Sequence, residues 1–499
     1  MIYIVNIFAI IVNALVLQKF LHLYQLKDYS FSRYNSAVFM RNYLYIVINL
    51  ICLLLTFVNN TILTLTLSVA TLMLNPLFNL NLVQSKKTPL KYTAKIKRLY
   101  ILSVIILIIP AFFKFGTMLI NILACFAPAI ANLLNVYDKI RNRIFINKAC
   151  EKLKLNKTKV IAITGSNGKT SVKNILYEMM KNSFTVIASP KSYNTPLGTA
   201  LFINESLTPM HRFVILEYGA RRKGDIKKLC KLFGADYGIV TCVAPQHLQT
   251  FHSIENVYRA KKELPDYLSA DLAVFNLDND QTKRMYSRKI GKKVGISVER
   301  KAEVYSSDIE IKDFKTQFTL HLGEDEFHLS TRLLGRHNIT NITLASALAF
   351  KLGVRASEIV KAVENLNFVP HRLELIRGRV NILDDSYNCS LASASEAIRV
   401  LNQIKTDTNC HTMIVTPGII EGGAYEEEIN RELGATCADA DYVVIVGEQN
   451  KKALSEGLQL KNHKNTVFAH SLEEAKKEFA RLNKSDTLLL LNDLPDDYK

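Results

Sequence analysis

Hydrophobic residues are distributed unevenly along the 499 residues, with long apolar runs in residues 1–150 and short, spaced runs after them. A helix that spans a bilayer needs about 20 apolar residues, with a range of about 17–25. The first, third and fifth runs reach that length, and the other two lie near its lower limit. We therefore predict a helical transmembrane region of about five spans, with three spans as the alternative. The runs cover residues 2–22, 43–58, 61–83, 99–115 and 117–135.

Charge is as uneven as hydropathy. Residues 1–150 carry 15 lysines and arginines and two acids, a net charge of +13, which leaves +5 of the chain's +18 for the remainder. Three basic loops alternate with two nearly uncharged turns, and basic loops stay on the cytoplasmic side of a membrane. The N-terminus is then outside and residues 136–499 are cytosolic. We expect a multi-pass protein of the bacterial inner (cytoplasmic) membrane, with its catalytic domains in the cytoplasm.

Two other interpretations of this region are disfavoured. A cleaved signal peptide would need a basic segment before its apolar run, and none precedes residue 2. The core of a large soluble domain would bring more acidic residues than the two found here. The high pI therefore reflects basic residues in loops beside the membrane segments. We expect inner membrane lipid as a partner of these loops and no nucleic acid partner.

Residues 151–499 alternate between short apolar strands and amphipathic helices. A strand at 159–164 leads to a helix at 169–182, and strands at 212–218 and 236–243 are followed by helices in the same way. This alternation predicts an α/β fold with a mostly parallel sheet. We expect an ATP-binding domain at residues 151–368, with an inserted small sheet at 293–334, and a Rossmann-like domain at 369–499 after the transmembrane region of residues 1–150.

The segment KVIAITGSNGKTS (159–171) has the order of strand, glycine turn and helix. Gly165 and Gly168 let the backbone approach an anion, and the helix N-terminus attracts negative charge. Lys169 can then reach terminal phosphates, and Thr170 can offer its hydroxyl to Mg²⁺. The spacing is shorter than that of the general phosphate loop, so a plain glycine turn is the structural alternative.

Further motifs follow this loop in a fixed order. Together with TGSNGKTS they resemble the Mur ligase family, whose members form amide bonds with ATP during synthesis of the peptidoglycan stem peptide. The resemblance covers about residues 155–499, and the combination of motifs is specific. The motifs are SYNTPLG (192–198), ILEYGARRKGDI (215–226), VAPQHLQTF (243–251), YRAKKEL (258–264), LLGRHNITNITLASALAF (333–350), PHRLE (370–374) and LDDSYNCS (383–390).

The motifs EYGA, GRHN and DDSYN resemble one branch of this family most. That resemblance implies addition of D-alanyl-D-alanine to UDP-muramoyl-tripeptide through an acyl phosphate, a step in cell wall biogenesis that supports cell shape and cell division. ATP and Mg²⁺ are the implied cofactors. The family pattern ends in Asn-Pro, whereas Cys389 follows Asn388 here, which puts the shape of this loop in doubt.

The resemblance also implies roles for individual residues. Lys169, His247 and Lys261 are the implied catalytic residues, and Lys261 matches the lysine that many members carry as a carbamate. Thr170, Glu217 and His247 are the implied metal ligands, while Asn194, Tyr387 and Asn388 are substrate candidates. The implied ATP contacts are Thr164, Gly165, Ser166, Asn167, Gly168, Lys169, Thr170, Asn338, Asn341, Arg372, Asp384 and Asp385.

For several of these residues a structural role is the alternative. Asn338 could be a helix N-cap, and Lys261 could be an exposed helix lysine. Either Asp384 or Asp385 would suffice for a ribose hydroxyl. ATP is expected between the two domains, with Arg372 and Asp385 facing Lys169 and Glu217.

Several other functions are alternatives to a ligase of this branch. They are a folylpolyglutamate- or cyanophycin-synthetase-like ligase, a membrane P-loop ATPase with a transport role, a membrane scaffold with an inactive ATPase fold, and a GTP-binding switch. A typical enzyme of the branch begins with a soluble domain for the UDP-muramoyl end, and the transmembrane region stands in its place. Our hypothesis is that this region tethers the enzyme to the membrane.

Overall fold

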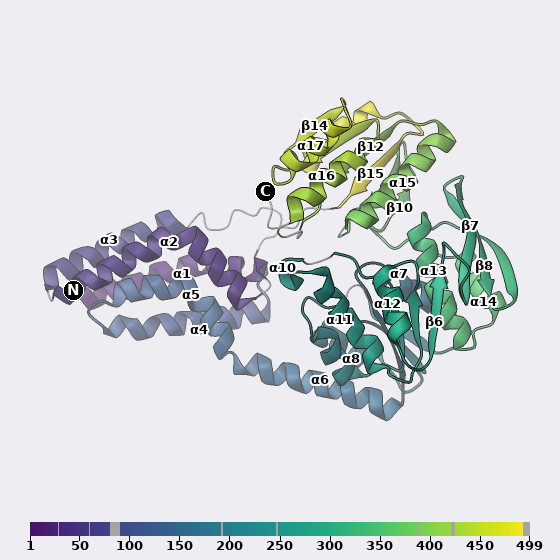
Figure 1. The fold of residues 1–499 in the computed structure, drawn as a ribbon. Coiled ribbons are helices and arrows are strands. Elements are labelled where there is room, and N and C mark those ends of the chain that lie inside the picture. Colours follow the sequence, from purple (N-terminus) through teal and green to yellow (C-terminus); the bar gives the residue numbers. More distant parts are fainter. Residues whose placement is uncertain are drawn as a thin grey trace. The chain divides into compact units, whose positions relative to one another are not determined.

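The computed structural model describes residues 1–27, 29–58, 60–79, 90–190, 193–245, 248–387, 390–420 and 425–492. They form two compact units, one of residues Met1–Arg141 and one that begins at Asn142 (Figure 1). The predicted boundary at residue 150 lies inside helix α6 (Val136–Asn156), whose Ala149 and Leu153 are buried in the core of the second unit. An apolar face of α6 continues into that core, so the division falls before the predicted boundary at residue 150.

The first unit is a bundle of apolar helices, in which α1, α2 and α4 all pack against α5 (Figure 1). Each of the five predicted runs contains a helix. By length and composition alone, four segments of the described residues can cross a membrane: Ile2–Leu26, Phe31–Val58, Thr61–Asn79 and Gly116–Asn156. The helices are α1 (Ile2–Leu26), α2 (Phe31–Leu55), α3 (Thr61–Asn79), α4 (Ala94–Ile108) and α5 (Gly116–Leu134), with 3₁₀ turns at Thr56–Val58 and Ile109–Phe112.

Helix α2 begins at Phe31, twelve residues before the predicted start at residue 43. The reason is a buried face that precedes the apolar run, since Tyr34 and Val38 lie four residues apart and are both fully buried. Helix α4 is short, with 15 residues, because Ile109–Phe112 continues it as a 3₁₀ turn. Because α2 begins at Phe31, Arg33 and Arg41 belong to this helix and not to a loop.

Asparagine side chains from four helices form a connected column inside the bundle. Asn121 lies at its centre: its Oδ1 accepts hydrogen bonds from Asn13 Nδ2 at 2.8 Å and from Asn75 Nδ2 at 3.2 Å. Its Nδ2 donates to Asn49 Oδ1 at 3.1 Å. All of these side chains are buried. We call Asn13, Asn42, Asn49, Asn75, Asn79 and Asn121 the asparagine column.

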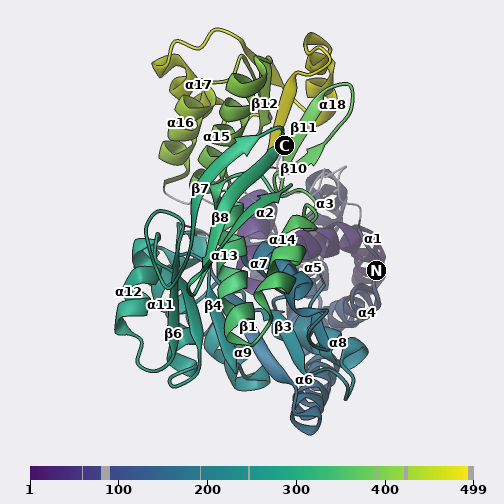
Figure 2. The same cartoon turned by 90° about the vertical axis from the view of Figure 1, so that its right-hand side faces the viewer.

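The second unit begins with a nine-stranded sheet in the order β2-β3-β1-β4-β5-β6-β7-β8-β9. Strands β2 to β7 pair in parallel, and helices cover both faces, with α7 and α13 on one and α9 and α11 on the other (Figure 2). The strands are β1 (Lys159–Thr164), β2 (Val186–Ala188), β3 (Phe213–Glu217), β4 (Tyr237–Val240), β5 (Ala273–Asn276), β6 (Lys293–Ser297), β7 (Val304–Lys312), β8 (Lys315–Leu322) and β9 (Asp325–Thr331). The helices are α7 (Lys169–Met180), α8 (Pro196–Ser206), α9 (Asp225–Phe233), α10 (Leu248–Phe251), α11 (Ile254–Tyr267), α12 (Asp280–Arg288), α13 (Arg336–Lys351) and α14 (Ala356–Glu364).

The predicted strands at 159–164, 212–218 and 236–243 are confirmed, as are the helices that follow them. The expectation of a separate small sheet at 293–334 was wrong. Strand β7 pairs in parallel with β6 through Ile296 and Ser297, which joins the antiparallel strands β8 and β9 to the main sheet.

A second sheet follows, in the order β10-β11-β15-β12-β13-β14, and it is parallel except for β10. This agrees with the predicted Rossmann-like series, to which the structure adds α17 and β14. The strands are β10 (Glu374–Ile376), β11 (Asn381–Asp385), β12 (Thr412–Thr416), β13 (Tyr442–Val446), β14 (Thr466–Ala469) and β15 (Thr487–Leu491). The helices are α15 (Leu391–Thr408), α16 (Glu426–Cys437), α17 (Lys451–Leu460) and α18 (Leu472–Ala475), with a 3₁₀ turn at Lys476–Arg481.

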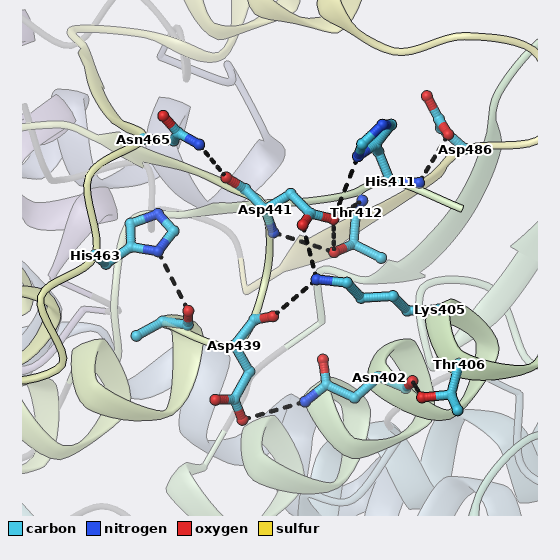
Figure 3. Close-up of polar contacts among 11 residues, drawn as sticks. Asn402, Lys405, Thr406, His411, Thr412, Asp439, Asp441, His463, Asn465 and Asp486 are labelled. Atoms are coloured by element: carbon cyan, nitrogen blue, oxygen red, sulfur yellow. Dashed lines mark hydrogen bonds and ion pairs between the residues drawn. The ribbon is translucent and has the colours of Figure 1, made fainter. Parts of the chain in front are cut away.

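A polar cluster fixes the amino ends of β12 and β13 (Figure 3). The carboxylate of Asp441 accepts hydrogen bonds from Lys405 Nζ and from the Thr412 backbone N–H, both at 2.8 Å, and Asn465 Nδ2 donates to the Asp441 carbonyl at 3.0 Å. The cluster holds α15 and two strands in register.

Asp385 ends the parallel strand β11 and therefore lies at the opposite, carboxyl edge, where open α/β sheets bind ligands.

The asparagine column generates a prediction for the first unit. Replacing Asn121 with Leu leaves the amides of Asn13, Asn49 and Asn75 without this partner, and each unsatisfied buried group costs roughly 1–3 kcal/mol. We expect the thermal unfolding midpoint of the detergent-solubilised full chain to fall. Thr66→Val is the matched control, because the exposed Thr66 hydroxyl bonds to the Ile62 carbonyl of its own helix. An equal effect of both changes would contradict the column's role in stability.

Candidate active site

The loop between β1 and α7 has the geometry of an anion cradle. Gly165 and Gly168 have φ values of +150° and +81°, and Gly168 caps the N-terminus of α7. A Cβ atom at Gly168 would lie 2.5 Å from Asn341 Oδ1, so only glycine fits between the loop and α13. The predicted order of strand, glycine turn and helix is confirmed, with the helix beginning at Lys169.

Two loop side chains bind the neighbouring strands. Thr164 Oγ1 donates to the Tyr218 carbonyl at 2.9 Å, and Ser166 Oγ donates to the Ala244 carbonyl at 3.0 Å. The Ser166 backbone N–H also donates to the Cys242 carbonyl at 2.8 Å. These residues shape the loop, because their hydroxyls are engaged by protein backbone.

Asn167 connects the loop to the second sheet's domain. Its Nδ2 donates to Ser390 Oγ at 2.9 Å, and Ser390 is the N-cap of α15. Its carbonyl accepts from Thr241 Oγ1 at 2.5 Å. The loop is thereby held from both of the domains that were expected to enclose the nucleotide.

Lys169 is partly buried and lies against its own loop. Its Nζ donates to the carbonyls of Gly165 and Ser166, both at 2.7 Å. Burial lowers the pKa of Lys169, while the nearby Glu217 carboxylate opposes that shift. The ammonium group therefore lies beside the loop carbonyls. Phosphate oxygens of a bound nucleotide would replace these carbonyls as its hydrogen-bond partners.

Glu217 ends β3 and forms two contacts with α7. Its Oε1 accepts a hydrogen bond from Lys173 Nζ at 2.8 Å, and both side chains are 1% exposed. Its Oε2 accepts one from Thr170 Oγ1 at 3.3 Å. Glu217 and Thr170, which the sequence suggested as ligands of one metal ion, are thus adjacent in the structure. Sequence reasoning missed Lys173, although its spacing of four residues from Lys169 places both on one helix face.

Four cationic side chains influence one another electrostatically around this carboxylate. Arg372 lowers the pKa of both Lys169 and Lys173, secondary to burial, and Lys169 in turn lowers that of Lys261. Positive charges are brought together in a water-poor place only at a cost in free energy. The arrangement therefore favours the binding of a ligand that carries negative charge.

Lys261 on α11 is not the exposed helix lysine of the structural alternative, since it is only 2% exposed. Burial, followed by the charge of Lys169, lowers its pKa to about 7. The adjacent Lys262 is bound to Asp266 on the protein surface. The structure therefore distinguishes two lysines between which the local sequence could not choose.

On the side of the second sheet, Arg372, Asp385 and Tyr387 line a cavity of about 220 Å³ together with Gly168 and Asn341. The Arg372 guanidinium lies over the Tyr387 ring, 4.4 Å from its centroid, and donates to Thr170 Oγ1 at 3.4 Å. The expected meeting of residues from the two domains is thus observed. Lys169, Thr170 and Glu217 lie beside Arg372 and are not among the lining residues of this cavity.

The two aspartates at the end of β11 point to different partners. Asp385 lines the cavity, and burial raises its pKa to about 6. Asp384 instead accepts a hydrogen bond from His371 Nδ1 at 2.8 Å and one from the Ser386 backbone N–H at 3.1 Å. Asp385 is therefore the one available to a ribose hydroxyl.

Asn338 and Asn341 both line the cavity from α13. The alternative of Asn338 as an N-cap was wrong, because Gly335 holds that position and Asn338 Nδ2 donates to the Leu334 carbonyl at 2.8 Å. This bond fixes the orientation of the Asn338 amide. It does not involve Oδ1, the atom that would contact a base.

Asn194 is described by the structure and is not among the residues that line the cavity. Asn194 packs beside Gly219 just after β3, where a Cβ on the glycine would lie 2.9 Å from Asn194 Cγ. His247 and Asn388 lie outside the described residues. Sequence reasoning also missed several lining residues: Thr241, Cys242, Asn276, His337 and Glu396. His337 was the one with a local signal, since it stands within the GRHN motif.

The residues present fit Mg²⁺ and a nucleotide. Thr170 Oγ1 and Glu217 Oε2 are adjacent oxygen donors of the kind Mg²⁺ prefers. Within the described ranges, no group of three or more histidine, cysteine, aspartate or glutamate side chains lies close enough to share a metal ion. Mg²⁺ keeps several waters and substrate phosphate oxygens in such sites, so two protein oxygens are sufficient.

Comparison with known proteins agrees with this geometry. Residues 163–349 match the family model of the Mur ligase middle domain. The chain resembles the UDP-N-acetylmuramoyl-tripeptide–D-alanyl-D-alanine ligase of Escherichia coli (strain K12), with 30% identity over 299 residues, 58% of this chain and 65% of the relative. The ligase of the same name from Buchnera aphidicola subsp. Baizongia pistaciae is 27% identical over 59% of this chain and 64% of the relative. The chain thus spans slightly less than two thirds of these relatives.

Solved structures show the same fold. MurF ligase from Thermotoga maritima in complex with ADP has a TM-score of 0.64 at 23% identity, covering 70% of this chain and 80% of that one. MurF from Acinetobacter baumannii has a TM-score of 0.62 at 24% identity, covering 70% and 76%. The chain therefore resembles the Mur ligase family over its middle domain and shares the fold of these ligases. These two relatives and these two solved structures are all of the MurF type.

The lowered pKa of Lys261 generates a prediction for carbamylation. Only a neutral amine reacts with CO₂, and a pKa of about 7 makes the neutral fraction rise steeply around neutrality. At fixed dissolved CO₂, the carbamate signal in ¹³C NMR should increase from about pH 6 to about pH 8. Lys261→Arg should remove the signal, whereas Lys262→Arg should leave it. A signal independent of pH, or one that persists in Lys261→Arg, would contradict the prediction.

Proposed function

We propose that this chain is an ATP-dependent ligase that joins D-alanyl-D-alanine to UDP-N-acetylmuramoyl-tripeptide during peptidoglycan precursor synthesis. The observation that carries the proposal is the pairing of Lys173 and Thr170 with Glu217 at the carboxyl edge of a parallel sheet. Lys169 lies in the adjoining loop, and Arg372 donates to Thr170. The names of the relatives supply the substrates.

The residues divide the work according to their positions. Lys169 and the N-terminus of α7 would bind the phosphates, and Thr170 with Glu217 would hold Mg²⁺. Asp385 and Asn338 line the cavity beside the loop, where they would contact ribose and base. Bound ATP with Mg²⁺ supplies the phosphoryl group that activates the tripeptide carboxylate for attack by the dipeptide amine. Buried cations placed before the reaction stabilise the charge that develops on the transferred group.

The test of this proposal is phosphate release and product mass, measured with detergent-solubilised full chain, ATP, Mg²⁺ and UDP-N-acetylmuramoyl-tripeptide. We expect release only when D-alanyl-D-alanine is also present, with a product heavier by one dipeptide less water. Lys169→Met should lower turnover by roughly 10²-fold or more, because it removes a cation from the transferred phosphoryl group. Release without the dipeptide would indicate an ATPase, and no release would move the search to lipid-linked acceptors.

We also propose that the first unit spans the bacterial inner membrane and tethers the ligase there. Its polarity is the reverse of a water-soluble bundle: on α1, Ile4, Ile11 and Leu15 are exposed, whereas Asn6 and Asn13 are buried. In water the apolar side chains would be inside. Hydrocarbon is the solvent in which an apolar surface and a hydrogen-bonded polar interior are both favourable.

Topology reporters test this membrane arrangement. The proposed topology takes α4 and the 3₁₀ turn Ile109–Phe112 together as a fifth span beside the four segments above. With the N-terminus outside, alkaline phosphatase fused after Asn60 should be active, and the same enzyme fused after Lys91 should be inactive, because it folds only outside the cytoplasm. A fluorescent protein that folds in the cytoplasm should give the opposite pattern. The tether hypothesis itself requires that a chain beginning at Asn142, the first residue of the second unit, keeps catalysis on soluble substrate. Equal activity of both phosphatase fusions, or loss of catalysis in that shorter chain, would count against these proposals.

A further inference from the structure

Lys173 is a buried ion-pair partner that the proposed mechanism does not yet use. It lies on α7 four residues after Lys169, and its ammonium contacts Glu217 Oε1 at 2.8 Å. Both side chains are 1% exposed. Taking both charges out of water offsets most of their attraction, so a buried pair by itself is a weak source of stability. A role at the site accounts better for its position.

The two oxygens of the Glu217 carboxylate face different groups. Oε1 is bound by Lys173, and Oε2 lies 3.3 Å from Thr170 Oγ1. A carboxylate free to rotate would present either oxygen to an ion. We infer that Lys173 is a positioning residue, which fixes Glu217 so that Oε2 and the Thr170 hydroxyl together receive Mg²⁺. This inference rests on the proposed function, because it concerns the metal that accompanies the nucleotide.

Lys173 differs in this respect from Lys169. Lys169 is bound to loop carbonyls, which a phosphate can replace without leaving a charge unpaired. Lys173 is bound to a carboxylate, and its departure would leave a buried anion without its partner, at a large cost. Lys173 therefore acts through Glu217 and not on the phosphates, and groups that orient a metal ligand change metal affinity by about 10–100-fold when removed.

The experiment measures binding of a fluorescent ADP analogue to the full chain, with Mg²⁺ and with a chelator in its place. In the Lys173→Met variant we expect the gain in affinity that Mg²⁺ provides to fall roughly 10-fold, beyond any loss of affinity that is measured in chelator. Lys181→Met is the matched control, because Lys181 pairs with Glu178 at the exposed end of the same helix. It should keep the full effect of Mg²⁺.

A double-mutant cycle adds a variant that carries neither of the two buried charges. Glu217→Gln and the double variant Lys173→Met/Glu217→Gln should show the same residual effect of Mg²⁺, because Lys173 has nothing left to position. A further loss in the double variant, or equal weakening with and without Mg²⁺ in Lys173→Met, would overturn the inference. Failure of the unaltered chain to bind the nucleotide would instead overturn the proposed function.

Discussion

The second unit depends on a concentration of positive charge in a buried place. Strands β1 and β3 are neighbours in a parallel register, so the loop after β1 and the carboxylate that ends β3 lie at the same edge of the sheet. Helix α7 begins there and carries Lys169 and Lys173 on one face. Helix α11 contributes the buried Lys261. Glu217 offsets part of this positive charge, because its carboxylate binds the most buried ammonium group directly.

Much of this could be predicted from the sequence because the signals are local. The glycine turn, Lys169 and Thr170 are contiguous, and the alternation of apolar runs with helices indicated a parallel sheet whose edge collects Glu217. The contribution of Lys173 could not be predicted in the same way. A lysine on an amphipathic helix normally faces water, and only the register of β1 against β3 brings a carboxylate to meet it. The choice of Asp385 over Asp384 likewise depends on His371, which is thirteen residues away.

The first unit illustrates a different limit. Apolar runs predicted the helices, but a run reports only that a segment avoids water. It does not show where its few polar residues point. Asn13, Asn75 and Asn121 are scattered over more than a hundred positions, and nothing local marks them as partners. Their meeting follows from the packing of α1 and α3 against α5, which no periodicity in a single helix describes.

The two units therefore use buried polarity for opposite purposes. In the asparagine column, the described donors and acceptors satisfy one another, so a neutral network of this kind specifies one arrangement of helices and has little affinity left for a ligand. Around Glu217 the groups are charged and unequal in sign, so Lys169, Lys173 and Arg372 leave an excess of positive potential that an anion can balance. A saturated network stabilises a fold, whereas an unbalanced one creates a binding site. The contrast supports a tether in the first unit and nucleotide chemistry in the second.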